Sequence, residues 1–371
     1  MSAVAELIRQ ADVLPEAWSS VSVAEALEKR RGGAITKLQT PDYLETGALP
    51  IVDQGAKLIC GYTNELDAAY PYDLPLIVFG DHTRTLKYID FPFAVGADGT
   101  QCLHPTDAFD SRFFFFALEN LDLRSEGYAR HFKLLKEKVI AQPPLDEQRL
   151  IAEVLRSVDD AIAAAVVVQE TTRSLLHSVR HNAFSNAKES IDFASAITLV
   201  SGQHVDTEQC NNVGLGVPYL TGPSDFPDGE IIVTKFTSTP SVMCQPGDIL
   251  VTVKGSGVGK AVIADSSYCI SRQLMAIRSD ELPTAFLFEA LQMVVEELNT
   301  EASGPIPGIT RAHILVKPIP VMERSAQESL AATFSSLRHQ LRLANEHLEL
   351  LGVCKSSVMA DLLSGRVRVP A

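Results

Sequence analysis

The length, composition and charge of the chain set the first limits. Its 371 residues are enough for two or three domains that each bury a core of their own. Hydrophobic residues make up 46% and charged residues 21%, which is ordinary for a globular protein, and no apolar run reaches transmembrane length. The start of the chain lacks the pattern of a signal peptide, and the six scattered cysteines argue against a disulfide framework, so we expect a reduced cytoplasm. The formal net charge of −14 argues against a nucleic-acid binder, although phosphate contacts need only a local basic stripe.

Residues 1–143 are predicted to form a strand-rich domain. Short apolar runs bounded by Gly, Pro and Asp predict strands at LPIVDQG, PLIVFG, TLKYID and FPFAVG, and a helical stretch follows at about 111–123. The loop GDHTRTLKY offers DNA-facing side chains, with Arg84 suited to a guanine edge and Thr85 and Lys87 to phosphates. A solvated turn is the alternative. The candidate DNA-binding residues here are Thr83, Arg84, Thr85, Lys87 and Tyr88.

A long helix is predicted next, over about 144–186. Its sequence opens PPLDEQRLIAEVLRSVDDAI and carries apolar residues at intervals of three and four, with no Pro or Gly inside. At 1.5 Å per residue a helix of this length spans about 60 Å. His177 and His181 lie four residues apart on it, a spacing that can bind a metal. Because H-E-x-x-H is absent, we expect a solvated or partner-facing surface there and predict no metal site.

Residues 188–320 are predicted to form a second strand-rich domain. GVPYLTG, EIIVTKF, GDILVTVKG and KAVIADSSYCI predict strands, and a helix follows at about 283–299. The loop GSGVGKA is not a P-loop, because Lys254 stands where glycine is required and Ala261 where Ser or Thr is required. A Gly-rich loop lets the backbone approach DNA, and its candidate contacts are Lys254, Ser256 and Lys260. A plain hairpin turn is the alternative.

Two further pairs in this domain are candidate DNA contacts. Arg272 is a guanine-type reader and Gln273 an adenine-type reader, although both are also compatible with a solvent-facing strand. Thr310 and Arg311 precede the last strand and helix, where either a phosphate contact or simple helix capping is expected.

The last predicted element is a second long helix over about 321–364. Leu330, Leu337, Ala344, Leu351 and Val358 repeat every seven residues, and Lys355 interrupts the neighbouring seam position. The two helical segments align as a repeat, which pairs Pro144 with Pro320 and Glu147 with Glu323. We expect the two helices to pack antiparallel, with local packing of each helix on its own domain as the alternative. The predicted fold is α+β and pseudo-twofold, divided into residues 1–143, 144–187, 188–320 and 321–371.

This organisation resembles the specificity (S) subunit of type I restriction-modification systems. PPLDEQRLIAEVLRSVDDAI looks like the family's proline-led start of the central spacer helix, and GPIPGITRAHILVKPIPVMERSAQ looks like its G-I-x-R segment leading into the second helix. GDILVTVKGSGVGKAVI and VFGDHTRTLKYIDFPFAVG resemble the cores of target recognition domains, and LLSGRVRV resembles the usual helix ending. The chain departs from the pattern at Glu323-Arg324, where Glu-Gln is expected, and HFKLLKEKVI stands where a first G-I-x-R segment is expected.

The resemblance implies a non-catalytic subunit that reads a split sequence in double-stranded DNA. Its helices would set the distance between the half-sites and dock two methyltransferase (M) subunits, and restriction (R) subunits would join for cleavage. The chain would need no cofactor of its own, whereas the partner methyltransferase would use S-adenosylmethionine. It would be cytoplasmic and have no membrane contact. The helix residues expected to bind partners are Gln148, Ile151, Leu155, Asp159, Ile162, Leu337, Leu341 and Leu348.

The sequence leaves other functions to compare with this one. Methyl transfer would need a Gly-rich cofactor turn and an Asn/Asp-Pro-Pro-aromatic motif, and backbone hydrolysis would need clustered carboxylates with Lys; neither pattern is present. A DNA mimic would account for the net charge, but the acidic residues are dispersed. A metal-dependent enzyme would have to use His82 or His104, which lack a ligand cluster at suitable spacing. A protein-binding helical scaffold remains the other alternative.

Overall fold

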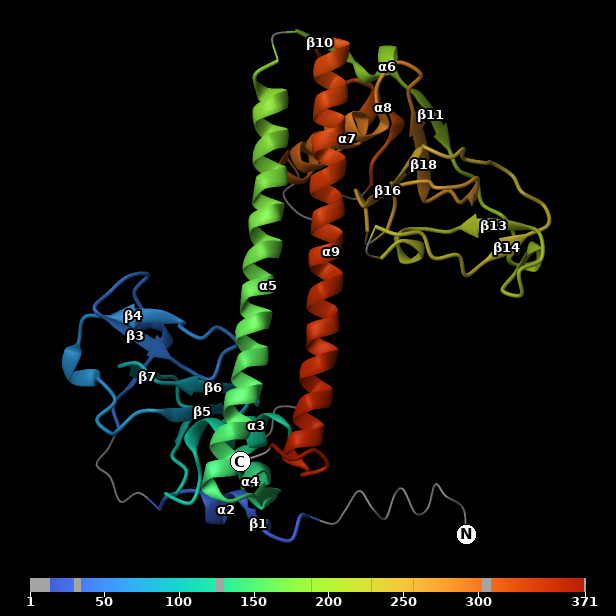
Figure 1. The fold of residues 1–371 in the computed structure, drawn as a ribbon. Coiled ribbons are helices and arrows are strands. Elements are labelled where there is room, and N and C mark those ends of the chain that lie inside the picture. Colours follow the sequence, from blue (N-terminus) through green and yellow to red (C-terminus); the bar gives the residue numbers. More distant parts are fainter. Residues whose placement is uncertain are drawn as a thin grey trace, which may run out of the picture. The chain divides into compact units, whose positions relative to one another are not determined.

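The computed structural model describes residues 14–29, 35–124, 130–187, 189–227, 229–255, 257–301 and 308–369 (Figure 1). Two compact units make up the chain: unit 1 contains residues 1–164 and 348–371, and unit 2 contains residues 165–347. The long helices α5 (Leu145–Ser185) and α9 (Arg324–Leu363) each contribute to both units. The units therefore differ from the predicted division in chain order, because each combines one strand-rich region with a part of both helices.

Within the described residues of unit 1, the strands form three small sheets. The four-stranded sheet has the order β2-β7-β3-β4, with only the β3–β4 pair antiparallel; an antiparallel three-stranded sheet has the order β6-β5-β8, and β1 pairs with β9. The elements are β1 (Ser19–Ser22), α2 (Val23–Ala26), β2 (Lys37–Leu38), β3 (Leu49–Val52), β4 (Gly61–Thr63), β5 (Leu76–Gly80), β6 (Leu86–Ile89), β7 (Ala94–Gly96), β8 (Thr100–Leu103), α3 (Ser111–Glu119), α4 (Phe132–Glu137) and β9 (Val139–Gln142).

The described part of unit 2 also contains three sheets. An antiparallel sheet has the order β11-β18-β15-β16. A mixed sheet has the order β12-β14-β13-β17, in which β13 and β17 are parallel and the other pairs antiparallel, and β10 pairs antiparallel with β19. The elements are β10 (Glu189–Asp192), α6 (Phe193–Ala196), β11 (Thr198–Ser201), β12 (Cys210–Asn211), β13 (Val217–Leu220), β14 (Phe236–Thr237), β15 (Ile249–Thr252), β16 (Ala261–Ile263), β17 (Cys269–Ile270), β18 (Leu274–Arg278), α7 (Thr284–Glu301), α8 (Arg311–Leu315) and β19 (Pro318–Val321).

The predicted strands form where an apolar run can bury both of its faces. All residues of β5 and β15 are buried, as expected for continuous apolar strands that are covered on both faces. The prediction for EIIVTKF is wrong, because only Phe236–Thr237 becomes a strand. The described residues of this run before Phe236 make no strand pairing. The Ile232 N–H instead donates to the Asp225 carbonyl at 2.7 Å, and Ile232 is 53% exposed.

Local chemistry also places the helix starts. Asp110 caps α3, because its carboxylate accepts the backbone N–H groups of Arg112 and Phe113. Ser22 and Glu25 form a reciprocal capping box at α2. Helix α3 then buries its phenylalanine-rich face in the core of unit 1, which fixes the helix against β5 and β6.

The segments of α5 and α9 pack antiparallel within each unit (Figure 1). In unit 2, Gln169 donates to the Asn345 side chain at 2.6 Å, and further along α5 the ring of Phe184 contacts Phe334, which lies earlier in α9. In unit 1, Leu155 shares a buried core with Met359, which lies further along α9 than Lys355, the ion-pair partner of Asp159. The predicted antiparallel pairing is thus observed, together with local packing of each helix on its own domain.

The same frame of short elements precedes each long helix. In both units an antiparallel strand pair (β1 with β9, β10 with β19) carries a short helix after its first strand, α2 or α6. A second short helix, α4 or α8, comes immediately before the last strand. HFKLLKEKVI therefore forms the counterpart of the G-I-x-R region, although the two sequences differ.

The structure corrects the predicted alignment of the two long helices. Helix α5 begins at Leu145 and α9 at Arg324, and the fourth residue of each is a buried glutamine. Gln148 donates to the carbonyl five residues earlier (Pro143, 2.8 Å), and Gln327 does the same (Met322, 3.1 Å). The counterpart of Gln148 is therefore Gln327 and not Arg324. In this register the glutamine of the Glu-Gln pattern is present, and the departure moves to Ala326, which stands where Glu147 stands in the first helix.

Paired charges hold the helices to the domain in each unit. In unit 2, the fully buried carboxylate of Glu289 on α7 accepts from Arg180 of α5 at 3.1 Å and from Arg338 of α9. In unit 1, Lys355 lies between Asp159 (2.8 Å) and Glu119 (3.0 Å). Burial alone would lower the pKa of the Lys355 ammonium, but hydrogen bonds to the two carboxylates outweigh it and raise that pKa. The lysine that interrupts the predicted seam is thus part of the helix packing.

Among the described residues, no helix combines the length and apolar character needed to cross a membrane.

Candidate nucleic-acid interface

A cleft of about 440 Å³ opens in unit 2 beside the β12-β14-β13-β17 sheet. Its floor includes the buried Tyr219, whose hydroxyl accepts the Val205 N–H at 3.3 Å and whose pKa is raised by burial. Its rim carries exposed polar side chains that can hydrogen-bond with base edges or phosphates: His204, Asn212, Lys235, Arg272 and Gln273.

Arg272 and Gln273 form the turn between β17 and β18, and both side chains are exposed. The Gly-rich loop after β15 runs beside this turn. The Val253 N–H donates to the Gln273 carbonyl at 2.8 Å, and a Cβ on Gly255 would lie 4.0 Å from Gln273 Oε1. The structure therefore brings together two candidate segments that are separate in the sequence, and Arg272 and Gln273 belong to a turn, not to a solvent-facing strand.

Glycine is required in this loop for two reasons. Gly255 and Gly259 have φ values of +92° and +89°, in the left-handed region that favours glycine. A Cβ on Gly257 would lie 2.4 Å from Pro223 Cγ, so this position allows close backbone approach. Lys254 and Lys260 flank the loop and are exposed, and within the described residues neither side chain has an ion-pair partner. Ser256, the third predicted contact of this loop, lies outside the described residues.

Thr310 and Arg311 have structural roles, because their side chains hydrogen-bond within the protein. The Thr310 hydroxyl caps α8 by accepting the His313 N–H at 3.3 Å. The Arg311 guanidinium donates to the Leu199 carbonyl at 2.9 Å and to Ser201 Oγ at 3.4 Å, which ties α8 to β11. The capping alternative thus describes Thr310, and we do not include either residue in the interface.

Sequence reasoning missed His204, Asn212 and Lys235 in the cleft. Three separate segments carry them, and they come together only when β12, β13 and β14 pair. The sequence Asn211-Asn212 does not indicate which asparagine lines the cleft with a free side chain. Asn211 Oδ1 accepts the N–H groups of Val213 and Leu215 and so shapes the loop, whereas Asn212 is exposed at the cleft.

In unit 1 the predicted reading loop is the turn between β5 and β6. Thr83 is exposed, and its hydroxyl donates to the Gln54 carbonyl at 2.5 Å. Arg84 has a left-handed backbone (φ +64°), and its guanidinium donates to the Leu123 carbonyl at 2.7 Å. Thr85 is half-buried, and its carbonyl accepts the Gly80 N–H at 2.9 Å. This turn is packed and hydrogen-bonded, in contrast to the solvated turn that was the alternative.

Lys87 and Tyr88 require a correction, because they lie in strand β6 and not in the loop. Lys87 is 5% exposed and donates to the Asp53 carbonyl at 2.7 Å, and burial lowers the pKa of its ammonium although the Asp53 carboxylate partly offsets this. The Tyr88 ring lies under the Arg112 guanidinium, 3.9 Å from its centroid. Neither side chain is available to a phosphate or base.

His104, and Asp81 beside His82, make contacts that hold the fold of unit 1 together. His104 is 7% exposed, bonds to the Tyr70 hydroxyl at 2.7 Å and stacks on the Tyr70 ring. Asp81, next to His82, accepts the Phe132 N–H at 2.8 Å and so anchors α4. Both patterns serve the packing of unit 1.

Four of the eight helix residues predicted to bind partners face the interior. Gln148, Ile151 and Leu155 have no exposed surface, and Leu337 is 7% exposed, so these four cannot form a docking surface. The physical reason is that the predicted seam is the stripe that each helix buries against its own unit. Asp159 bonds to Lys355, and three further residues are half-buried: Ile162, Leu341 and Leu348.

A second apolar stripe lies on the solvent-facing side of α5. Val154, Ala161, Val168 and Leu175 recur every seven residues, and all four are exposed. On α9, Leu343 and Leu350 are also seven apart, with exposures of 46% and 68%. A heptad of exposed apolar side chains is typical of a helix that packs against a further helix.

Comparison with known proteins gives two curated relatives, although no protein-family model matches the chain. A putative type I restriction enzyme MjaX specificity subunit of Methanocaldococcus jannaschii is 24% identical over 258 residues, which cover 63% of this chain and 60% of the relative. The EcoR124I/EcoR124II specificity subunit of Escherichia coli is 37% identical over 70 residues, which cover 16% and 17% of the two chains. The chain thus spans less than two thirds of each relative's length.

Solved structures match over nearly the whole chain. The S subunit of a type I restriction-modification system from M. genitalium gives a TM-score of 0.66 at 17% identity, covering 95% of this chain and 97% of the other. A chain from work on complex assembly and conformational transition of the type I R-M system gives 0.56 at 16%, covering 96% and 100%. The fold is therefore that of a type I S subunit, with α5 and α9 in the place of its long helices. The resemblance to type I specificity subunits, predicted from the sequence, is confirmed.

Proposed function

We propose that this chain is a non-catalytic specificity subunit that reads a split sequence in double-stranded DNA. The observation that carries the proposal is the cleft of unit 2, where Arg272 and Gln273 project from a turn beside a Gly-rich loop flanked by two exposed lysines. Arginine pairs with guanine and glutamine with adenine through two hydrogen bonds each, so this rim has the chemistry of direct readout. Lys254 and Lys260 would contact phosphates and set the register.

The net charge of −14 does not oppose this assignment, because DNA meets a local surface. Around the cleft, Lys235 and Arg272 are exposed basic side chains, and the Gly-rich loop adds Lys254 and Lys260. The strand-rich part of unit 1 would read the other half-site. Because the same frame of elements precedes each long helix, we expect a pseudo-twofold arrangement in which the helices set the spacing of the half-sites.

We assign partner docking to the exposed stripe of α5 and not to the buried seam. Its apolar side chains at seven-residue intervals fit helices of a partner subunit, and two methyltransferase (M) subunits, one for each half-site, are the expected occupants. Restriction (R) subunits would join for cleavage. The methyltransferase would supply S-adenosylmethionine chemistry, and this chain would hold no cofactor for it. The complex would act in the cytoplasm.

The test is to co-express the chain with the methyltransferase encoded beside it and to map methylated bases with and without the chain. The expected result is a complex that methylates one split sequence, which neither protein methylates alone. Arg272→Ala and Gln273→Ala should each relax one position of one half-site, at a cost of about 1–3 kcal/mol against the native base. Lys254→Ala should instead weaken binding to all sequences and reduce the salt slope by about one, whereas the control Lys133→Ala on α4 should change neither.

Two results would contradict the proposal. If the complex forms but methylation keeps its full specificity in the Arg272 and Gln273 variants, the cleft is not the reading surface. If no complex forms and the chain neither binds DNA nor redirects methylation, a protein-binding scaffold or an acidic DNA mimic becomes the better explanation.

A further inference from the structure

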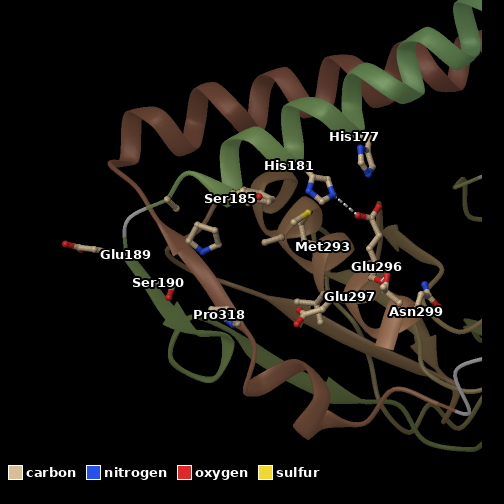
Figure 2. A pocket seen from close by; sticks show the side chains of 16 residues that line it. His177, His181, Ser185, Glu189, Ser190, Met293, Glu296, Glu297, Asn299 and Pro318 are labelled. Atoms are coloured by element: carbon tan, nitrogen blue, oxygen red, sulfur yellow. Dashed lines mark hydrogen bonds and ion pairs between the residues drawn. The ribbon is translucent and has the colours of Figure 1, made fainter. Parts of the chain in front are cut away.

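The end of α5 carries a cluster of potential metal ligands that the DNA-reading function does not use. His177 and His181 lie one helical turn apart, and Glu296 of α7 faces them across the boundary between the two helices (Figure 2). One ligand atom from each of the three lies within 4.8 Å of the others. His181 Nε2 and Glu296 Oε2 are already 3.5 Å apart, and the two imidazole centroids are 4.3 Å apart. All three residues belong to unit 2.

These distances are close to those of a metal centre. Ligand atoms about 2.0–2.1 Å from a tetrahedral ion lie about 3.3 Å from one another. The His181–Glu296 pair, at 3.5 Å, is close to this separation. His177 is exposed, so a rotation of its side chain can close the remaining distance without disturbing packed neighbours.

The orientation of Glu296 is set by a neighbouring residue. Arg180 donates one N–H group to Glu296 Oε1 and another to the buried Glu289, so its charge is shared between two carboxylates. Glu296 Oε2 is left directed at His181. Hydrogen bonds of this kind orient a metal-ligating carboxylate and leave its second oxygen for the ion.

The cluster also has room for further ligands. It borders a pocket of about 860 Å³ that reaches from α5 and α7 to β10 and β19, with Ser185, Asn299 and Pro318 on its wall (Figure 2). The side chains of His181 and Glu296 are 44% and 41% exposed, so an ion bound between them would be reachable from solvent. Two imidazoles and one carboxylate with open positions are typical of Zn²⁺ and other first-row transition ions, whereas Mg²⁺ and Ca²⁺ prefer all-oxygen sites.

We propose that His177, His181 and Glu296 bind one divalent transition-metal ion, with Zn²⁺ as the expected occupant. The ion would join the last turns of α5 to α7 and so fix the second strand-rich region on its helix within unit 2. Sequence spacing alone did not predict this site, because the third ligand comes from a helix more than a hundred residues further along the chain.

The experiment uses the full chain without a polyhistidine tag, in a Cys354→Ser background that removes the exposed thiol on α9. Zn²⁺ binding is measured by calorimetry, and Co²⁺ is added separately to read its visible absorption. Variants His177→Ala and His181→Ala are compared with His347→Ala, an exposed histidine of α9 in the same unit. A second readout is the melting temperature with Zn²⁺ and after chelation with EDTA.

The expected result is one Zn²⁺ per chain, with a Kd at least tenfold weaker in each of the two site variants and unchanged in His347→Ala. Zn²⁺ should raise the melting temperature of the parent chain by a few degrees, reversibly with EDTA, and leave unaffected the double variant that combines His177→Ala with His181→Ala. Equal Zn²⁺ binding by the double variant, or no binding by the parent chain, would overturn the proposal. Both readouts need no DNA or methyltransferase, so they stand or fall separately from the proposed function.

Discussion

The buried carboxylate of Glu289 allows a quantitative test of how the long helices are held in unit 2. Glu289 has no exposed surface, and it accepts hydrogen bonds from Arg180, whose side chain is 8% exposed, and from Arg338, whose side chain is 34% exposed. Removing the carboxylate in Glu289→Ala leaves two guanidinium groups without this partner, and Arg180 Nε already has no acceptor among the residues that the structure describes. Breaking a buried ion pair from one side costs about 3–5 kcal/mol. We expect the loss at the lower part of this range, because Arg180 keeps the Glu296 carboxylate as a partner and Arg338 is partly exposed to solvent.

The assay is urea unfolding of the full chain followed by circular dichroism at constant pH. Glu289→Gln keeps the shape and one acceptor, so its loss should be smaller than that of Glu289→Ala. The matched control is Glu328→Gln, which removes the ion pair between Glu328 and Arg324, both on α9. Both of these side chains are about 60% exposed, so the expected change in the free energy of unfolding is below about 0.5 kcal/mol.

Additivity provides the refutation. If Glu289 and Arg180 interact, the double variant Glu289→Ala, Arg180→Ala should be more stable than the sum of the single losses predicts. A Glu289→Ala loss no larger than that of Glu328→Gln, or strict additivity in the double variant, would show that the triad does not hold α5 and α9 to α7.

Three further predictions concern the starts and ends of the helices. Hydrogen bonds from Arg368 outweigh burial and lower the pKa of Glu147, so the stabilising contribution of its carboxylate is present above the unfolded pKa of about 4.3 and is lost as pH falls through the folded value. When the free energy of unfolding in urea is measured at pH 6 and pH 3, Glu147→Gln should lose less stability between the two pH values than the parent chain does. Equal losses would contradict this. Gln148→Leu and Gln327→Leu each leave backbone carbonyls without a donor, so each should cost about 1–3 kcal/mol in the same assay; a loss in only one of them would contradict the corrected register of the repeat. Lys355→Met should cost no more than about 1 kcal/mol, because its carboxylate partners are each 35% exposed; a loss of several kcal/mol would show that the pair is more deeply buried in solution.

The long helices were predictable because their signal is local and repeated. Apolar residues at intervals of three and four continue for about forty residues, and only a helix puts them on one face. The same signal identified the stripe that each helix buries, and not the exposed stripe that we propose for a partner. Val154, Val168 and Leu175 form the outer stripe, and a sequence cannot tell which of two heptads a domain will cover.

The alignment of the two halves shows the same limit. Proline and glutamate positions in the sequence paired Glu147 with Glu323, but the equivalent positions are defined by hydrogen bonds. Gln148 and Gln327 correspond because each bonds to the carbonyl five residues before it, and this moves the register by almost one helical turn. Prolines at a helix start tolerate small shifts, whereas a buried amide needs its acceptor at one place.

The α+β class, the two long helices, most of the apolar strands and the resemblance to type I specificity subunits could be predicted from the sequence, because periodicity, turn residues and short motifs act over neighbouring residues. Which polar residues share a surface depended on the tertiary structure. It buried Lys87 in β6, brought the Arg272–Gln273 turn beside the Gly-rich loop, and placed Glu296 against His177 and His181. Such sites depend on contacts between segments far apart in the chain, and a position's burial is set by what packs over it.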